Sequence, residues 1–553
     1  MAGNWLGLLS MAGFYIVVLG TGIWASRKSK REEKKCTGNR SEIAMVGGRN
    51  LQIWVSIFTM TATWVGGGYI LGNAEVVYNP TKGLVWATGP IAFTLNMIIG
   101  GLFLVKPIRS KSYVTLMDPF QEKYGNTVAA ILFLPGLLAD IFWIACILGA
   151  LGGTISVVMD ISSSLAMSIS AAVAIIYTLM GGLYSVAYTD VIQLSFMFFG
   201  LWLCVPFILT SPPAANFTLA AVTHLYQEPW IGKLELENAG RWTDDILLVS
   251  IGGICYQAFY QRVLSTATDT QAKMTCYVAA VLCPILGIPS LIIGAVAAST
   301  NWNQTTYGTP SPYEGGKAGM ILPIALHNLC PSYISVIGVG ALAASVMSSI
   351  DSALLSAASQ VGRNFFKNII YKQASEKQIL IVVKVSIFLC GSIGAALAMT
   401  SSSIHLFWII SADVLYSMMA PQVICTFFFK EWVNEFGACS GFVVAILLRV
   451  LVGETLLGLP DVLPLPWDKI QEDGHRYRLF PFRTAIMLLN IGINFLVSRV
   501  TVWLSQKRLL KRTCDTEVDT TLQIMAPDLV KDDWPCKEQR LISQESNEEQ
   551  EKY

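Results

Sequence analysis

The sequence predicts an all-α integral membrane protein. Of its 553 residues, 53% are hydrophobic and only 14% are charged, and the mean hydropathy is +0.54. A soluble domain of this length would need more polar surface. The apolar residues also gather in long runs, and about 20 apolar residues are what a helix needs to cross a bilayer. The number of such runs predicts about 13 transmembrane helices.

The composition also argues against several other classes of protein. A net charge of +1 offers no basic excess for nucleic acid. The twelve cysteines are scattered without a CxxC pair, so we expect buried thiols rather than a disulfide framework. The four histidines stand far apart, which disfavours a catalytic metal site. No nucleophile, base and orienting group occur together and no P-loop is present, so an enzyme is not expected.

The predicted spans follow one another along most of the chain. The first run, residues 5–25, has no basic residue before it and a dense basic run after it, so we expect a retained span with its N-terminus outside. The run at 320–356 is too long for one straight crossing, which predicts tilt or a re-entrant or amphipathic lead-in at Pro323. The other spans are expected near 51–72, 84–105, 127–150, 165–186, 190–210, 244–264, 276–298, 379–399, 403–428, 435–456 and 484–504.

The distribution of Lys and Arg supports this orientation, because these residues collect on cytoplasmic loops. With the N-terminus outside, the inward loops carry Arg27, Lys28, Lys30, Arg31, Lys106, Arg109, Lys111, Arg363, Lys367, Lys372, Lys507, Arg508, Lys511 and Arg512. The C-terminus is then cytosolic. Glycosylation sequons at Asn216 and Asn303 fall outside, whereas one at Asn39 falls inside and should be silent.

Two glycine clusters, at 66–68 and 252–253, lie five spans apart. Irregular backbone at membrane depth is tolerated where it lines a cavity, so the clusters predict two broken helices at a substrate site. Their spacing predicts an inverted five-plus-five repeat of residues 51–210 and 244–428. Either cluster alone reads equally well as a packing seam of small residues. Residues 1–26 would hold the first span, 435–504 two C-terminal spans, and 505–553 a disordered cytoplasmic tail with a trafficking signal around Leu541 and Ile542.

Residues 177–190, YTLMGGLYSVAYTD, resemble the signature of the sodium/solute symporter family. Segments 59–69, 106–120, 261–265, 299–308 and 346–352 extend the resemblance over about residues 5–505 and are most similar to the choline-transporting members. The resemblance implies a LeuT-like inverted repeat and a sodium-coupled, chloride-dependent symporter that takes up choline and supports acetylcholine synthesis. It also implies a multi-pass protein of the plasma membrane, with presynaptic or synaptic-vesicle membranes as further locations.

A selective choline site needs a cage of aromatic faces, because a quaternary ammonium group has no N–H to donate. The resemblance implies that the rings come from Trp64, Phe93, Trp143, Tyr256 and Trp408. Phe93 stands where the family usually has Tyr, and Tyr256 where it usually has Trp, which leaves the exact substrate open. Any single Trp also fits an interfacial belt or helix packing. For Trp64, the adjacent glycine cluster favours the site.

Sodium prefers oxygen ligands, and span 9 offers several of them. Ser345, Ser348 and Ser349 share one face of a helix. The resemblance implies one sodium between this face and backbone carbonyls near Thr61 to Trp64, and a second that involves Asp351. An acid within an apolar span is a functional candidate by default. The alternatives are helix packing by small residues and a structural carboxylate.

Three further positions stay outside the predicted site. Asp140 replaces a Glu that is frequent in the family, and Asp413 follows a Ser as in the family. Asn50 stands where an acid is common, so a gating salt bridge would be lost.

Three other functions remain open or disfavoured. A symporter for another small organic solute, or a non-transporting sensor on the same frame, is compatible with the sequence. A channel is disfavoured because no repeated filter element occurs. The expected partners are choline, sodium, chloride and the lipid bilayer, while a homo-oligomer and trafficking adaptors on the tail stay open.

Overall fold

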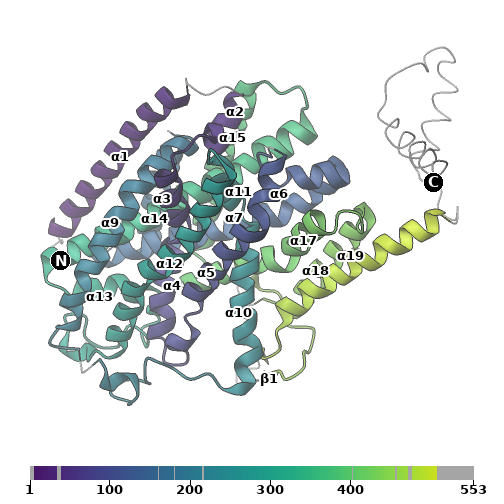
Figure 1. The fold of residues 1–553 in the computed structure, drawn as a ribbon. Coiled ribbons are helices and arrows are strands. Elements are labelled where there is room, and N and C mark those ends of the chain that lie inside the picture. Colours follow the sequence, from purple (N-terminus) through teal and green to yellow (C-terminus); the bar gives the residue numbers. More distant parts are fainter. Residues whose placement is uncertain are drawn as a thin grey trace, which may run out of the picture. The chain divides into compact units, whose positions relative to one another are not determined.

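The computed structural model describes residues 5–33, 39–111, 113–159, 161–179, 181–214, 217–401, 403–454, 457–470 and 476–506. Residues 1–496 form one compact unit and residues 497–553 a second, of which only the end of the last helix is described. The first unit is almost entirely helical (Figure 1). Its one described sheet pairs β1 (Lys469–Ile470) with β2 (Arg476–Tyr477) in antiparallel fashion, with Lys469 opposite Tyr477.

The predicted fold class is confirmed, since nine helical segments in the described part are long and apolar enough to cross a membrane. Large apolar side chains remain exposed on them, such as Phe199 at 70% and Ile381 at 60%, as lipid contact requires. The uninterrupted helices are α1 (Trp5–Glu33), α8 (Ser163–Leu179), α9 (Leu183–Leu209), α12 (Asp269–Ala298), α15 (Glu376–Ala398), α18 (Glu435–Val452) and α19 (Phe482–Gln506). Helix α7 (Asp118–Met159) has a kink at Gly125, whose φ is +79°, and its predicted span lies after the kink. The count of 13 crossings and the inverted repeat remain predictions.

The remaining predicted spans coincide with interrupted helices. Two interruptions are non-helical breaks. The first separates α3 (Ile53–Trp64) from α4 (Gly67–Tyr78). The second separates α10 (Ala239–Gly252) and the 3-10 turn η6 (Gly253–Cys255) that follows it from α11 (Gln257–Ser265). Two others are π-helical turns, η3 (Gly100–Leu104) between α5 (Gly89–Ile99) and α6 (Val105–Ser110), and η10 (Leu415–Met419) between α16 (Ile404–Val414) and α17 (Ala420–Phe428).

The long run at 320–356 contains two helices, as its length, too great for one straight crossing, led us to expect. The short α13 (Ile321–Leu329) precedes α14 (Ser332–Gln360), which continues as the π-helix η9 (Val361–Ile370). The interruption falls at Cys330 and Pro331, because proline cannot supply the N–H that a continuous helix needs.

Helix α14 is buried along nearly its whole length and packs against α9, α7 and α3 (Figure 1). Small residues permit this close approach. A Cβ atom on Gly200 of α9 would lie only 2.6 Å from the Cβ atom of Ala341. Helix α14 can therefore present polar side chains directly to the breaks in its neighbours. The short α2 (Arg40–Val46) packs against α11.

Candidate functional site

The break between α3 and α4 consists of two residues. The Val65 amide donates to the Thr61 carbonyl at 2.9 Å and closes α3, and Gly66 then turns into an extended conformation. A Cβ atom on Gly66 would lie 1.8 Å from the Ser349 hydroxyl oxygen, so only glycine fits against α14. The break leaves Trp64 as the last residue of α3.

The second break follows η6, where Tyr256 adopts an extended conformation before α11 begins. The carbonyls released at the end of α10 need other donors. The Asn96 side-chain amide supplies one, donating to the Ser250 carbonyl at 2.9 Å. A Cβ atom on Gly253 would lie 2.5 Å from that amide nitrogen, so the second glycine cluster also permits a close approach. Trp64 and Tyr256 thus stand at the two breaks.

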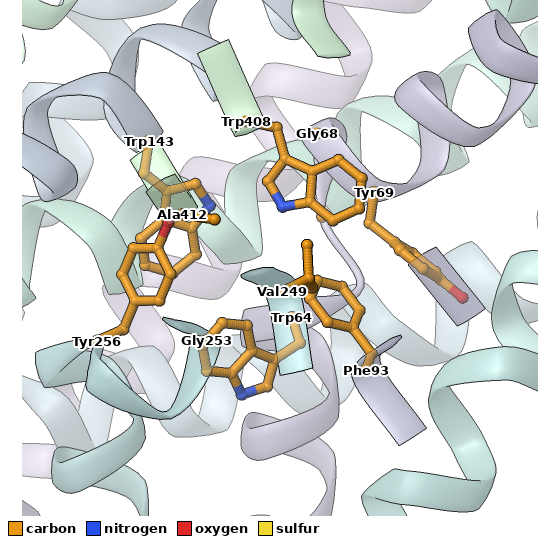
Figure 2. Close-up of a pocket in the computed structure, with 11 residues that line it drawn as sticks. Trp64, Gly68, Tyr69, Phe93, Trp143, Val249, Gly253, Tyr256, Trp408 and Ala412 are labelled. Carbon is orange, nitrogen blue, oxygen red and sulfur yellow. The ribbon is translucent and has the colours of Figure 1, made fainter. Parts of the chain in front are cut away.

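All five rings that the family resemblance assigned to a cage line one cavity. Figure 2 shows them around a common space, with Tyr69 beside Phe93. None of the five is more than 6% exposed. The ring centroids of Trp64 lie 5.6 Å from Phe93, 6.0 Å from Trp143 and 5.5 Å from Tyr256. Trp408 closes the opposite side, with its centroid 5.6 Å from that of Phe93.

The cavity is narrow and carries no charged side chain among its lining residues. Its volume of ≈ 10 Å³ matches about one water-sized sphere. The rings must therefore separate to admit a quaternary ammonium group. The walls consist of aromatic faces and small residues, including Gly68, Gly253 and Ala412.

Residues outside the cage hold two of its rings. The Tyr256 hydroxyl donates to the Ser411 hydroxyl, which in turn donates to the Ala139 carbonyl at 2.7 Å. The Phe93 ring packs against Tyr69 at 4.9 Å, and the Tyr69 hydroxyl donates to the Cys283 carbonyl at 3.0 Å. Tyr69 is a lining residue that the sequence analysis missed, although it directly follows the first glycine cluster.

The predicted serine face of α14 lies against the first break. The Ser345 hydroxyl contacts the Val65 carbonyl at 2.8 Å. The Ser348 hydroxyl lies 3.2 Å from the Ala62 carbonyl, and the Ser349 hydroxyl 3.2 Å from that of Thr63. Hydroxyl and carbonyl oxygens from two helices therefore converge, as a sodium ion requires.

Thr61 is oriented differently from the serines. Its hydroxyl donates to the Ile57 carbonyl at 2.8 Å within α3, and its carbonyl accepts the Val65 amide. The carbonyls that face the serines belong instead to Ala62, Thr63 and Val65.

Asp351, one turn beyond the serines, lies in a buried polar cluster. One of its carboxylate oxygens accepts the Thr178 hydroxyl at 2.6 Å, and the other has no partner in the described part of the chain. Asp190 lies in the same cluster, accepts the Thr59 hydroxyl and stands 3.7 Å from Arg262. Its second oxygen also lacks a partner among the described residues. Two carboxyl groups and one arginine therefore share this cluster, and each carboxyl group offers one oxygen to a further partner.

Asp190 was missed by the sequence analysis, although it closes the 177–190 signature. Its partners lie far away in sequence, and no local pattern links it to Thr59 or Arg262.

The other acids singled out in the sequence have partners of their own. Asp140 accepts hydrogen bonds from Ser356 at 2.9 Å and Gln360 at 3.0 Å. Asp413 lies 2.7 Å from Arg449 and 3.4 Å from Arg483.

The remaining predicted positions lie away from the cage. Asn303 is exposed on the loop after α12, and Asn50 is exposed after the 3-10 turn η1 (Gly47–Arg49). Asn216, Leu541 and Ile542 lie outside the described residues.

Comparisons with known proteins agree with this architecture. A model of the sodium:solute symporter family matches residues 45–445. The human high affinity choline transporter 1 is 43% identical over 509 residues, which cover 92% of this chain and 87% of that protein. The high-affinity choline transporter 1 of Drosophila melanogaster is 42% identical, with 88% and 77% covered.

Among solved structures, a substrate-bound, outward-open Na+-coupled sialic acid symporter matches with a TM-score of 0.67 at 18% identity. The match covers 89% of this chain and 98% of that one, and it shows a shared fold. Because the family model spans most of the chain and the relatives are similar over nearly its full length, this chain belongs to the sodium:solute symporter family.

Proposed function

We propose that this protein is a sodium-coupled symporter that takes up choline into cells. Membership of a symporter family makes it a transporter rather than an enzyme. The observation that carries the substrate assignment is the cage, in which five rings enclose one uncharged cavity at the two helix breaks. Aromatic faces attract a quaternary ammonium by about 0.5–2 kcal/mol each when water is excluded. The names of the relatives favour the same substrate.

The proposed coupling site is the oxygen cluster of Ser345, Ser348 and Ser349 with the carbonyls of the first break. Trp64 is the last residue of α3, so the cage and this cluster share one element. A sodium ion held there would fix the break and with it the Trp64 ring. Asp351 and Asp190 would serve a second sodium, because each has an unpartnered oxygen among the described residues.

The deciding experiment is uptake of radiolabelled choline by cells that express the protein. Replacing external sodium with N-methyl-D-glucamine should abolish concentrative uptake. Ser349→Ala and Asp351→Asn should weaken the sodium dependence while the protein still reaches the plasma membrane, its proposed location. If cells accumulated choline to the same level without sodium as with it, the sodium coupling would be refuted.

A symporter for another small organic solute is the second candidate, since Phe93 and Tyr256 differ from the rings usual in the choline-transporting members. Competition by betaine, carnitine and tetramethylammonium distinguishes the two. A chloride requirement is also part of the proposal and is tested by replacing chloride with gluconate. A non-transporting sensor would bind choline without accumulating it.

A further inference from the structure

Two cysteine side chains meet near the end of α9, at the junction between α13 and α14. Cys204 lies close to the C-terminal end of α9, and Cys330 stands between α13 and α14. The Cys330 thiol donates a hydrogen bond to the Cys204 sulfur, and the Cys204 thiol donates to the Gly200 carbonyl at 3.1 Å. The two sulfur atoms are therefore in contact, although they are distant in sequence.

The packing around Cys204 also holds its sulfur against the start of α14. The sulfur lies 3.8 Å from the Ile334 carbonyl, in the first turn of that helix. A Cβ atom on Gly338, one turn later, would lie 2.6 Å from the same sulfur, so this approach requires a glycine. The position of Cys204 beside the α13–α14 junction thus follows from helix packing as well as from the thiol contact.

Both cysteines lie at the end of the bundle that is predicted to face outward. The segment after α9 pairs with the segment after α12, since the Asn301 amide donates to the Pro213 carbonyl at 3.0 Å. The segment after α12 carries Asn303 and leads to α13. Disulfides form and persist on this side of a plasma membrane. Cys330 is half-buried and Cys204 fully buried, so a reagent from outside meets Cys330 first.

The backbone at Cys330 leaves room for the two sulfurs to approach each other. Cys330 is extended, with φ −99° and ψ 153°, and Pro331 after it also lies outside the helices. A disulfide brings its two sulfurs to about 2 Å from each other. Cys330 can make this movement without breaking a helical hydrogen bond, because it belongs to neither helix.

We propose that Cys204 and Cys330 are a reversible oxidation site, whose sulfurs are joined as a disulfide by a peroxide on the outer side of the membrane. The Cys330 thiolate attacks hydrogen peroxide, the O–O bond breaks, and a sulfenic acid and hydroxide form. The Cys204 thiolate then attacks the Cys330 sulfur, the S–S bond forms, and the S–O bond breaks to release a second hydroxide. The two thiol protons convert both hydroxides to water, so two thiols lose two electrons and one peroxide gains them.

This oxidation should be slow. The hydrogen bond to Cys204, and then burial, raises the pKa of the Cys330 thiol. The thiolate that attacks the peroxide is therefore scarce at neutral pH.

The disulfide would restrict the hinge between α13 and α14. Helix α14 already packs closely on α9, and Cys330 with Pro331 is the non-helical link through which α13 can turn relative to α14. Helix α13 in turn packs against α4, whose Gly68 and Tyr69 line the cage. This step rests on the proposed function: the rings must separate to admit choline, and α4 cannot move outward while α13 is held. A bridged molecule should therefore not transport.

The bridge is tested first by chemistry alone. The purified full-length protein is treated with hydrogen peroxide, its free thiols are blocked with N-ethylmaleimide, and it is digested without reduction. Mass spectrometry of the wild type should show two peptides joined through Cys204 and Cys330, which a phosphine reductant separates. Cys204→Ser and Cys330→Ser should each lose the joined pair. Cys439→Ser, at a half-buried cysteine of α18, is the matched control and should keep it.

The hinge is tested by choline uptake into cells that express the protein. Peroxide should lower the initial rate of wild-type uptake in proportion to the bridged fraction at the cell surface. Tris(2-carboxyethyl)phosphine, which does not cross membranes, should restore the rate. Cys330→Ser should keep its full rate in peroxide, whereas Cys439→Ser should lose uptake as the wild type does.

The absence of a joined peptide in the peroxide-treated wild type, or a bridge from Cys330 to another cysteine, would overturn the oxidation site. A bridge that leaves uptake unchanged, or an equal loss of uptake in Cys330→Ser, would overturn the role of the hinge. If the bridge forms as described but neither the oxidised nor the reduced protein accumulates choline, the oxidation site stands and the proposed function fails.

Discussion

At the scale of single residues, each cage ring has a different degree of support. Tyr256 is fixed by the hydrogen-bond chain through Ser411 to the Ala139 carbonyl, and Phe93 by the Tyr69 ring. Trp64 touches three of the other rings and stands at the end of α3. A change at Trp64 therefore removes one cation–π face and also loosens the contacts of the others.

Trp64→Ala should weaken the apparent affinity for choline by roughly five- to thirtyfold, the effect of losing one face worth ~1–2 kcal/mol. The measurement is the concentration dependence of sodium-driven choline uptake, corrected for surface expression. Trp54→Ala is the matched control, because Trp54 lies on the same helix but is 71% exposed and distant from the cage. An unchanged affinity in Trp64→Ala would remove this ring from the substrate site.

Tyr256→Phe separates the ring from its hydroxyl. The aromatic face remains, and Ser411 keeps its own hydrogen bond to Ala139, so the loss is one hydrogen bond of about 0.5–1.5 kcal/mol. We expect an affinity reduced by no more than about tenfold, whereas Tyr256→Ala should lose uptake. Equal effects of the two substitutions would mean that Tyr256 acts through its hydroxyl and not through its ring.

At the scale of elements, the sequence located both helix breaks because glycine is required where α14 or Asn96 approaches the backbone. It did not indicate the π-helical turns η3, η9 and η10. A π-helical turn changes no local composition and depends on tertiary packing. The same limit explains the missed site residues, since Asp190 and Thr59 meet across 131 positions of sequence.

Gly66→Ala should abolish transport, because the new methyl group would lie 1.8 Å from the Ser349 hydroxyl oxygen and 2.5 Å from its Cβ atom. The break and the serine face would be forced apart, and the oxygen cluster would open. Gly149→Ala is the matched control, since a Cβ atom there meets nothing within 4 Å. Uptake and surface biotinylation together provide the measurement. If Gly66→Ala still transports with normal sodium dependence, the serine face is not the coupling site.

At the scale of the whole molecule, the predicted orientation assigns opposite ends of the bundle to opposite sides of the membrane. Helix α12 has 30 residues and rises about 45 Å. The loop with Asn303 follows the C-terminal end of α12. Helix α2, which Asn39 precedes, contacts α11, and α11 leads directly into the N-terminal end of α12. The hydropathy of the sequence predicted these spans, because a bilayer demands about 20 apolar residues regardless of tertiary contacts.

Glycosylation tests this orientation directly, because oligosaccharide is added only on the side that becomes extracellular. Asn303 is exposed and precedes Thr305 in an intact sequon, so Asn303→Gln and Thr305→Ala should each remove the same glycan and increase electrophoretic mobility equally. Asn39→Gln should change nothing, since the adjacent α2 lies at the opposite end of α12. After treatment with peptide-N-glycosidase, the wild type should have the same electrophoretic mobility as Asn303→Gln, except for the difference that a glycan at Asn216 would make. A glycan at Asn39 would invert the topology, and the end of the bundle that carries Asn303 would then face the cytosol.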